Sequence, residues 1–139
     1  MRYEFREGPL NSTGDIEAAL TTQGSNTAPG PITVPAGASK IKQLIAAIGD
    51  NTPTGADKNA AIVVRLSGSG LKDGEQSFVV GGYFCVFTTA GDNGFGALPA
   101  KVFNVDIDVV PGGTISIFGQ QVLGVDLGVP ELGVALGFA

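Results

Sequence analysis

The chain has 139 residues, of which 43% are hydrophobic and only 15% are charged, compared with about 25% charged residues in an average soluble domain. It contains no His and one Cys, which argues against the usual zinc sites, an intrachain disulfide and catalytic arrangements that need a His base. The net charge of −5, with no cluster of basic residues, argues against direct binding to nucleic-acid phosphates.

Glycine and proline are spread through the whole sequence. The 22 Gly and 8 Pro residues follow no period of three, and they separate short runs rich in Val, Ile and Phe. This composition is typical of an all-β domain with many turns. The length predicts one folded domain, which we divide into an N-terminal arm at residues 1–31 and a β-sandwich, jelly-roll-like domain at residues 32–139.

The predicted arm begins with a short alternating stretch, Tyr3-Glu4-Phe5-Arg6, and continues as a polar segment. Residues 15–20 suit a short helix, with Ser12, Thr13 or Asp15 as its cap, and we expect the remainder to be extended. Because charges alternate near the N-terminus and no apolar segment follows them, we expect no standard secretion signal.

Residues 39–48 are ambiguous between a helix and a strand. Their apolar side chains follow the i, i+3, i+4, i+7 spacing of a helix: Ile41, Leu44, Ile45 and Ile48. The same stretch also alternates as a strand would if one of its faces were fully buried. Turn residues on both sides, Pro35 and Gly37 before it and residues 49–51 after it, favour the strand. We therefore predict a strand and keep the helix as the alternative.

Further strands are predicted from β-branched, aromatic and alternating runs at residues 60–66, 77–89, 102–109, 114–118, 121–125 and 133–138. The pair Gly81-Gly82 predicts a bulge or bend within the second of these runs. No long amphipathic helix stands between the strands. The set predicts an all-β fold, a β-sandwich or jelly roll, rather than a parallel α/β fold.

The last predicted strand is apolar to its end. Large side chains at Val134, Leu136 and Phe138 alternate with small residues. We expect the large face to pack on the core and the small face to let another layer or subunit come close. No transmembrane helix is expected, because the longest charge-free stretch, residues 109–125, is broken by Pro111 and its neighbouring glycines.

Few residues of the sequence suggest a catalytic or ligand-binding site. The stretch SGSGLKDG resembles a phosphate-binding loop, but a predicted strand rather than a helix follows it, so we expect an ordinary loop. Asp106 and Asp108 share one strand face and could act in acid/base work or bind a hard cation. We favour a solvated outer face for them, and a small buried side chain for Cys85. We expect no catalytic residue, no metal and no cofactor.

The chain resembles small jelly-roll shell proteins of viruses. The resemblance lies in the arm without net basic charge, in VPAGASKIKQLIAAIG, in IVVRLSGSGLKDGEQSFVV and in the apolar last strand. It implies a structural role, with subunits joined by strand pairing and arm exchange. Unlike genome-packaging arms, this arm offsets Arg2 and Arg6 with Glu4 and Glu7. This difference from genome-packaging arms favours a shell that does not touch the genome, or a filament or decoration subunit.

These observations lead to one main hypothesis, a non-enzymatic virion capsid subunit. It would bind copies of itself, with other shell proteins as further partners, through Tyr3, Phe5, Val134, Leu136 and Phe138. An extracellular filament or decoration subunit is the first alternative. A carbohydrate-type β-sandwich binding module is the second, although the chain has no Trp to stack on a sugar. An enzyme on a cupin-like jelly roll is disfavoured, because such metal sites depend on His.

Overall fold

The computed structural model describes residues 1–9, 18–19, 30–49, 58–85, 100–122 and 131–139. In these residues every regular element is a strand: β1 (Arg2–Pro9), β2 (Ala18–Ala19), β3 (Ile32–Thr33), β4 (Lys40–Gly49), β5 (Lys58–Ser67), β6 (Gln76–Cys85), β7 (Lys101–Asp108), β8 (Thr114–Val122) and β9 (Glu131–Phe138). The described part of the chain holds no helix of the length and hydrophobicity that a membrane span needs.

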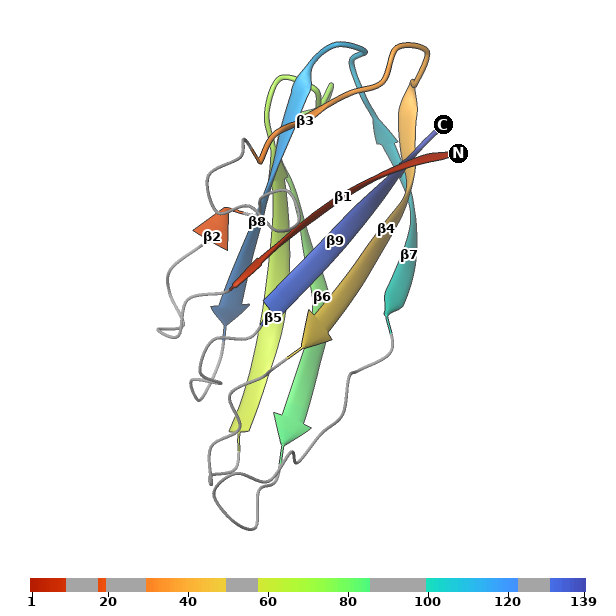
Figure 1. Ribbon diagram of the computed structural model, residues 1–139. Coiled ribbons are helices and arrows are strands. Elements are labelled where there is room, and N and C mark those ends of the chain that lie inside the picture. Colours follow the sequence, from red (N-terminus) through yellow and green to blue (C-terminus); the bar gives the residue numbers. More distant parts are fainter. Residues whose placement is uncertain (10–17, 20–29, 50–57, 86–99, 123–130) are drawn as a thin grey trace.

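The strands form two antiparallel sheets, which confirms the predicted all-β class. The first sheet has the order β1-β9-β4-β7, and the second has the order β2-β8-β5-β6 with β3 also paired to β8. Figure 1 shows them as two layers. Their buried side chains form one hydrophobic cluster, and its largest fully buried members come from both sheets: Ile32, Ile41, Leu44, Ile62, Leu66, Ile115, Ile117, Leu132 and Phe138.

The strand pairs are nested along the chain. β1 pairs with β9, β2 with β8, β4 with β7, and β5 with β6. Successive pairs alternate between the first and the second sheet. The outermost of these pairs brings residues 2 and 138 together, with Arg2 directly opposite Phe138 (Figure 1).

β9 confirms the predicted ordered strand at residues 133–138. It lies between β1 and β4, and its large side chains enter the core. The end of the chain is also fixed, because Ala139 N donates to Lys40 O at 2.9 Å and Ala139 O accepts from Ser39 N at 2.9 Å. Burial and backbone pairing together offset the entropy that ordering a chain end costs.

β4 confirms the strand at residues 39–48 and explains why its sequence resembles a helix. The register against β9 shifts between Ile41 and Gln43, so Lys42 is an extra residue in a β-bulge. Ile41 is buried before the bulge, and burial then continues at Leu44, in the opposite alternation phase. Because of the shift, the buried residues Ile41 and Leu44 are three positions apart instead of two, which resembles the spacing of a helix.

Two other predicted elements differ in the structure. Ala18–Ala19, within the short helix expected at residues 15–20, form the strand β2 because they pair with the edge of β8. Residues 114–118 and 121–122, expected to belong to separate strands, lie in the single strand β8 because it pairs without a break along β5. The register shift beside Gly81 in β6 agrees with the bulge predicted there.

The N-terminal residues take a definite place in the first sheet. Residues 2–9, which we assigned to an arm, pair with β9 along the whole of β1. The other parts of the predicted arm, residues 10–17 and 20–29, lie outside the described residues. The domain boundary at residue 32 therefore stays a prediction.

The turns at one end of the two sheets pack closely. The stretch SGSGLKDG connects two strands, as predicted, rather than leading into a helix. Gly70 and Gly113 touch through their backbones, and a Cβ placed on Gly113 would lie 2.6 Å from Gly70 Cα. Gly70 N donates to Thr114 O at 2.8 Å, and Val110 N donates to Gly70 O at 2.9 Å. The glycines here serve backbone packing.

Candidate functional site: the outer face of the first sheet

The outer face of the first sheet consists of the side chains that the alternation turns away from the core. In β9, Leu132, Val134, Leu136 and Phe138 point inward, so Gly133, Ala135 and Gly137 point outward. Residues directly opposite one another in an antiparallel pair share a face. The register then places the following residues on the outer face: Tyr3, Phe5 and Glu7 of β1, Gln43, Ile45 and Ala47 of β4, and Val102 and Asn104 of β7.

β1 has the reverse polarity of an ordinary surface strand. Its aromatic side chains face outward, with Tyr3 49% and Phe5 42% exposed. Its charged Arg2, Glu4 and Arg6 lie opposite the inward-facing residues of β9. None of the buried apolar residues of the described core comes from β1. Since outward positions of an antiparallel sheet are usually polar, packing of this chain's own core does not explain the aromatic rings.

Glycines in β9 make room for these rings. A Cβ placed on Gly137 would lie 2.9 Å from Tyr3 Cε1, and one placed on Gly133 would lie 3.0 Å from Phe5 Cζ. The Tyr3 ring therefore crosses β9, and its hydroxyl donates to Gln43 Oε1 at 2.6 Å. The small face of the last strand, which we expected to admit another layer or subunit, is thus partly covered by the chain's own N-terminal strand.

An apolar row crosses all strands of the first sheet. Phe5 lies opposite Ala135, Ala135 opposite Ile45, and Ile45 opposite Val102. Val102 is 56% exposed, while Ile45 and Ala135 are half-buried. The row offers a continuous apolar strip to the solvent, one side chain wide on each strand.

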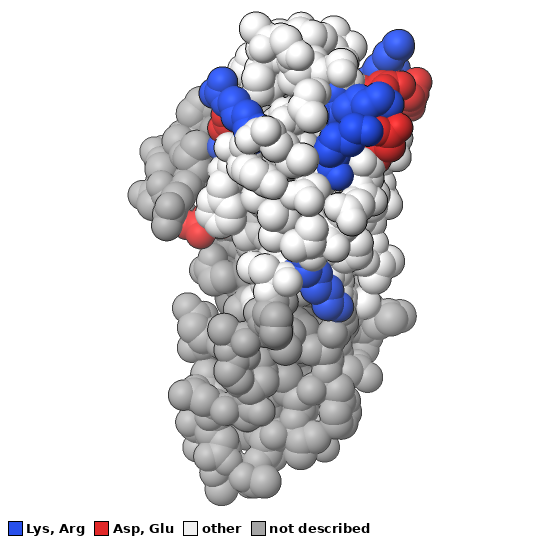
Figure 2. All heavy atoms as spheres, turned by 90° about the vertical axis from the view of Figure 1, so that its right-hand side faces the viewer, with Lys and Arg blue, Asp and Glu red and all other residues white. Residues whose placement is uncertain are grey.

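Polar and charged side chains lie on one side of this row. Gln43 Nε2 donates to Asn104 Oδ1 at 3.4 Å. Beyond them, Lys40 Nζ lies 2.8 Å from Asp106 Oδ2 and 3.0 Å from Asp108 Oδ1, and Lys42 also pairs with Asp106. In Figure 2, charged side chains of both signs gather in the upper part of the described surface, and most of the described surface below them is white, with a separate blue side chain near its lower limit.

These ion pairs shift the pKa of two groups. The hydrogen bond from Lys40, followed by that from Lys42, lowers the pKa of the Asp106 carboxyl to about 2. Hydrogen bonds to Asp106 and then to Asp108 raise the pKa of the Lys40 ammonium above its ordinary 10.5. The two carboxylates that we considered as ligands of a hard cation thus face lysines. The described residues contain no group of three or more His, Cys, Asp or Glu side chains placed to hold a metal.

The structure separates the predicted contact residues into two sets. Tyr3 and Phe5 lie exposed on the outer face. Val134 and Leu136 are 0% exposed and Phe138 is 2% exposed, which removes these three as direct contacts to a partner in this fold. The physical reason is the alternation of β9, which directs every large side chain of this central strand into the core.

Ile45, Val102 and Ala135 were not among the predicted contacts. A signal existed for Val102, because the alternation of residues 102–109 already placed it on the polar face of that strand, as the structure confirms. The bulge at Lys42 hid the orientation of Ile45. The row itself depends on the register between strands, which no local pattern contains.

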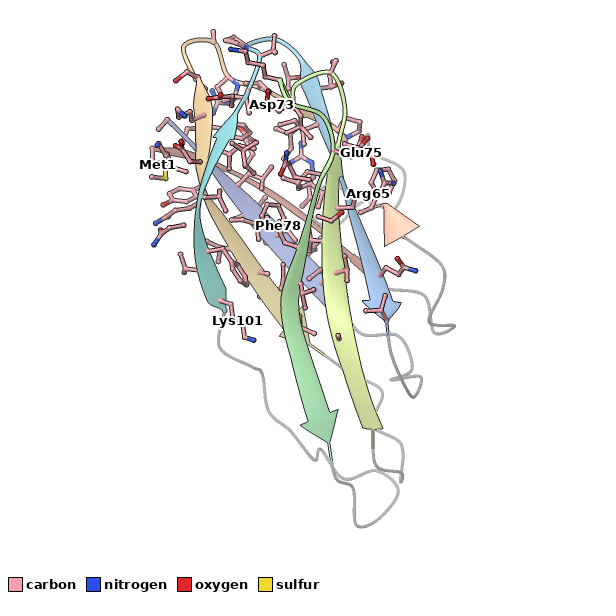
Figure 3. The ribbon with its side chains drawn as sticks, turned by 180° about the vertical axis from the view of Figure 1, so that it is seen from behind. Met1, Arg65, Asp73, Glu75, Phe78 and Lys101 are labelled. Carbon is pink, nitrogen blue, oxygen red and sulfur yellow. The ribbon has the colours of Figure 1, made fainter. Side chains whose placement is uncertain are left out.

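The second sheet presents a different outer surface. The Arg65 guanidinium lies 4.3 Å from the centroid of the Phe118 ring and 2.8 Å from Glu75 Oε1. Figure 3 shows Arg65 and Glu75 on the same side of this sheet, with Phe78 between the layers. Because Arg65 covers one side of the Phe118 ring, that ring is a poor platform for a sugar. The side chain of Cys85 lies outside the described part of the chain.

Comparisons of the chain with models of protein families, with curated proteins and with solved structures found no match. The function is therefore inferred from the residues of this chain.

Proposed function

We propose that the protein is a non-enzymatic structural subunit that assembles with copies of itself into a protein shell, as a virion capsid protein does. The observation that carries this proposal is the apolar row on the outer face of the first sheet. Phe5 and Val102 leave 42% and 56% of their surface in the solvent, and burial of this apolar surface against a second subunit would be favourable. Contiguous exposed apolar surface of this kind marks interaction sites.

The strand order supports the same proposal. Nested antiparallel pairs that alternate between two sheets are the arrangement expected of a jelly roll, a double-sheet fold that viral capsids use. Lectins and cupins share this fold, so the fold alone does not choose among functions. The outer face favours assembly, because it joins aromatic and aliphatic side chains to a border of paired charges.

The polar groups of the outer face suit an interface better than catalysis. Within the described residues, the Tyr3 hydroxyl donates a hydrogen bond to the Gln43 amide oxygen. Lys40 pairs with Asp106 and Asp108, and Lys42 pairs with Asp106. Paired charges at the margin of an apolar strip agree with the polar rim of protein interfaces. The same pairing leaves the lysines a poor phosphate-binding patch, in keeping with our expectation that the subunit does not bind nucleic acid directly.

The proposal is tested by the size of the purified protein. We expect particles or larger oligomers in light scattering and electron microscopy as the concentration rises. Electron microscopy also distinguishes a closed shell from an open filament, which differ only in the rotation between neighbours. A protein that stays monomeric at every concentration would overturn the proposal.

A matched pair of variants tests the surface itself. Val102→Lys places a charge in the apolar row, and Val79→Lys places the same charge at a 67% exposed valine of β6, in the second sheet. We expect Val102→Lys to prevent assembly and Val79→Lys to leave it intact. Equal effects of the two variants would contradict the assignment to the outer face.

A further inference from the structure

β1 leaves one side of its backbone without a strand partner among the described residues. It is the first strand in the order β1-β9-β4-β7, so β9 occupies only one of its two edges. Such an edge presents backbone donors and acceptors to any other strand. We propose, on the basis of the proposed self-assembly, that β1 pairs antiparallel with β1 of a second copy about a twofold axis at Phe5, which joins two first sheets into one.

The two faces of β1 limit the possible registers. Tyr3 and Phe5 face outward, while Arg2, Glu4 and Arg6 face inward. Opposed residues of an antiparallel pair share a face, so a continuous sheet must pair outward residues with outward residues. In a twofold pairing this requires the axis to pass through a residue and not between two residues.

The charges of β1 choose among these registers. An axis at Glu4 would oppose Glu4 to its own copy and Arg2 to Arg6, and an axis at Arg6 would oppose Arg6 to its own copy. An axis at Tyr3 would pair little more than residues 1–5. Only the axis at Phe5 opposes Glu4 to Arg6 in both directions and pairs residues 2–8 throughout. Cross-strand pairs of opposite charge stabilise a sheet, and like charges directly opposite destabilise it.

The existing contacts of Arg6 are compatible with this register. Its guanidinium donates to the backbone carbonyls of Gly30 at 2.8 Å, Phe5 at 2.7 Å and Pro31 at 3.4 Å, and it has no carboxylate partner among the described residues. Glu4 pairs with Arg2 at 2.9 Å, a residue whose side chain is 69% exposed. In the proposed pairing, Glu4 of the second copy supplies Arg6 with the carboxylate that it lacks.

The same register continues the apolar row across the junction. Phe5 would lie opposite Phe5 of the second copy on the outer face, and Tyr3 opposite Glu7. Because Phe5 is the β1 member of the row, the rows of the two copies would meet at the axis. Aromatic cross-strand pairs are among the favourable ones. The dimer would thus double the apolar surface that we propose for assembly.

A disulfide tests the position of the axis. In a Cys85→Ser background, Phe5→Cys places a thiol opposite its own copy, within the roughly 4.4–6.8 Å between Cα atoms that a disulfide spans. Tyr3→Cys is the matched control, because Tyr3 and its copy would be offset by roughly 13 Å along the strands. Under mild oxidation in assembly conditions, we expect a covalent dimer from Phe5→Cys and none from Tyr3→Cys.

Charge exchange tests the register independently. Glu4→Arg and Arg6→Glu each place like charges opposite one another twice, and we expect each to raise the concentration needed for dimerisation roughly ten- to thirtyfold. The double variant Glu4→Arg/Arg6→Glu restores opposite charges, and we expect it to dimerise as the unmodified protein does. Circular dichroism of each variant checks that the fold is kept.

The outcomes separate this inference from the proposed function. Large assemblies without a Phe5→Cys dimer, without rescue in the double variant, or with equal cross-linking of Tyr3→Cys would overturn the β1 pairing and leave the proposed function standing. A cross-linked dimer that never grows would support the pairing and overturn the shell. A protein that is monomeric throughout would overturn both.

Discussion

The Tyr3 hydroxyl donates a hydrogen bond to Gln43 Oε1 at 2.6 Å across an intervening strand. The contact is possible because Gly137 of β9, opposite both residues, has no side chain to fill the space under the Tyr3 ring. One hydrogen bond thus connects β1 to β4, two strands away in the same sheet. The hydrogen-bonded side chains also lie between the apolar row and the charged end of the outer face.

Loss of this hydrogen bond should lower stability slightly, and the effects of changing its two partners should not be additive. We expect Tyr3→Phe and Gln43→Met each to lower the free energy of unfolding by about 0.5–1 kcal/mol, since a typical intramolecular hydrogen bond contributes about that much. In a double-mutant cycle by urea denaturation, the double variant should lose less than the sum of the two single variants. Strict additivity would show that the hydrogen bond contributes nothing.

The backbone contact between Gly70 and Gly113 predicts a position that tolerates no side chain. Gly113→Ala would force a Cβ against Gly70 Cα, at 2.6 Å, and Gly70 N, at 2.8 Å. Because backbone cannot move aside as a flexible side chain can, we expect a loss of at least about 2–3 kcal/mol.

The comparison for Gly113→Ala is Gly37→Ala. A Cβ on Gly37 meets nothing within 4 Å, but φ is +87°, so only backbone strain of about 1–2 kcal/mol applies. Thermal and urea unfolding should rank Gly113→Ala as the more damaging change. The reverse order would mean that the turns can open without cost.

The core position of β9 predicts that its large side chains are essential for folding. Leu136→Ala should cost about 2–5 kcal/mol, because the side chain is 0% exposed and its removal leaves a cavity. Val79→Ala, at a 67% exposed position, should change stability by no more than about 0.5 kcal/mol. Deletion of residues 132–139 should abolish folding, and a truncated chain with a cooperative unfolding transition would contradict this role.

The pairing of Asp106 with Lys40 and Lys42 predicts a pH dependence. The pKa of Asp106 falls from its ordinary 3.8 to about 2 on folding, so its stabilising contribution is complete above pH 3.8 and is lost as the pH drops through about 2. Denaturation between pH 5 and pH 2 should show a smaller acid loss in Asp106→Asn than in the unmodified protein. Because these groups are exposed, salt should reduce the difference.

Much of the fold follows from alternation in the sequence. The alternation of residues 102–109 places Ile107 and Val109 inside. In residues 133–138, the alternation of large with small side chains is enough to indicate which face is buried. β4 was harder to predict, because the bulge at Lys42 changes the phase of the pattern halfway along the strand. A single extra residue is invisible in composition, yet it decides which side chains are buried.

The candidate site was only half predictable for a related reason. Alternation in Tyr3-Glu4-Phe5-Arg6 indicates two faces but not which one is inside, and β1 turns its apolar face outward. Val134, Leu136 and Phe138 were expected both to pack the core and to contact a partner, and a central strand with one buried face allows only the first. The row from Phe5 to Val102 arises from register among strands distant in the sequence.

The nested strand pairs also have a consequence for the order of folding. β5 and β6 are joined by the loop at residues 68–75, whereas pairing β1 with β9 brings together residues as distant as Arg2 and Phe138. Closing a longer loop costs more entropy, and non-local pairing slows folding. By loop entropy alone the innermost hairpin closes first and β1 docks last. The surface that we propose for assembly is therefore completed only when the rest of the chain has folded, so that we expect folding to precede assembly.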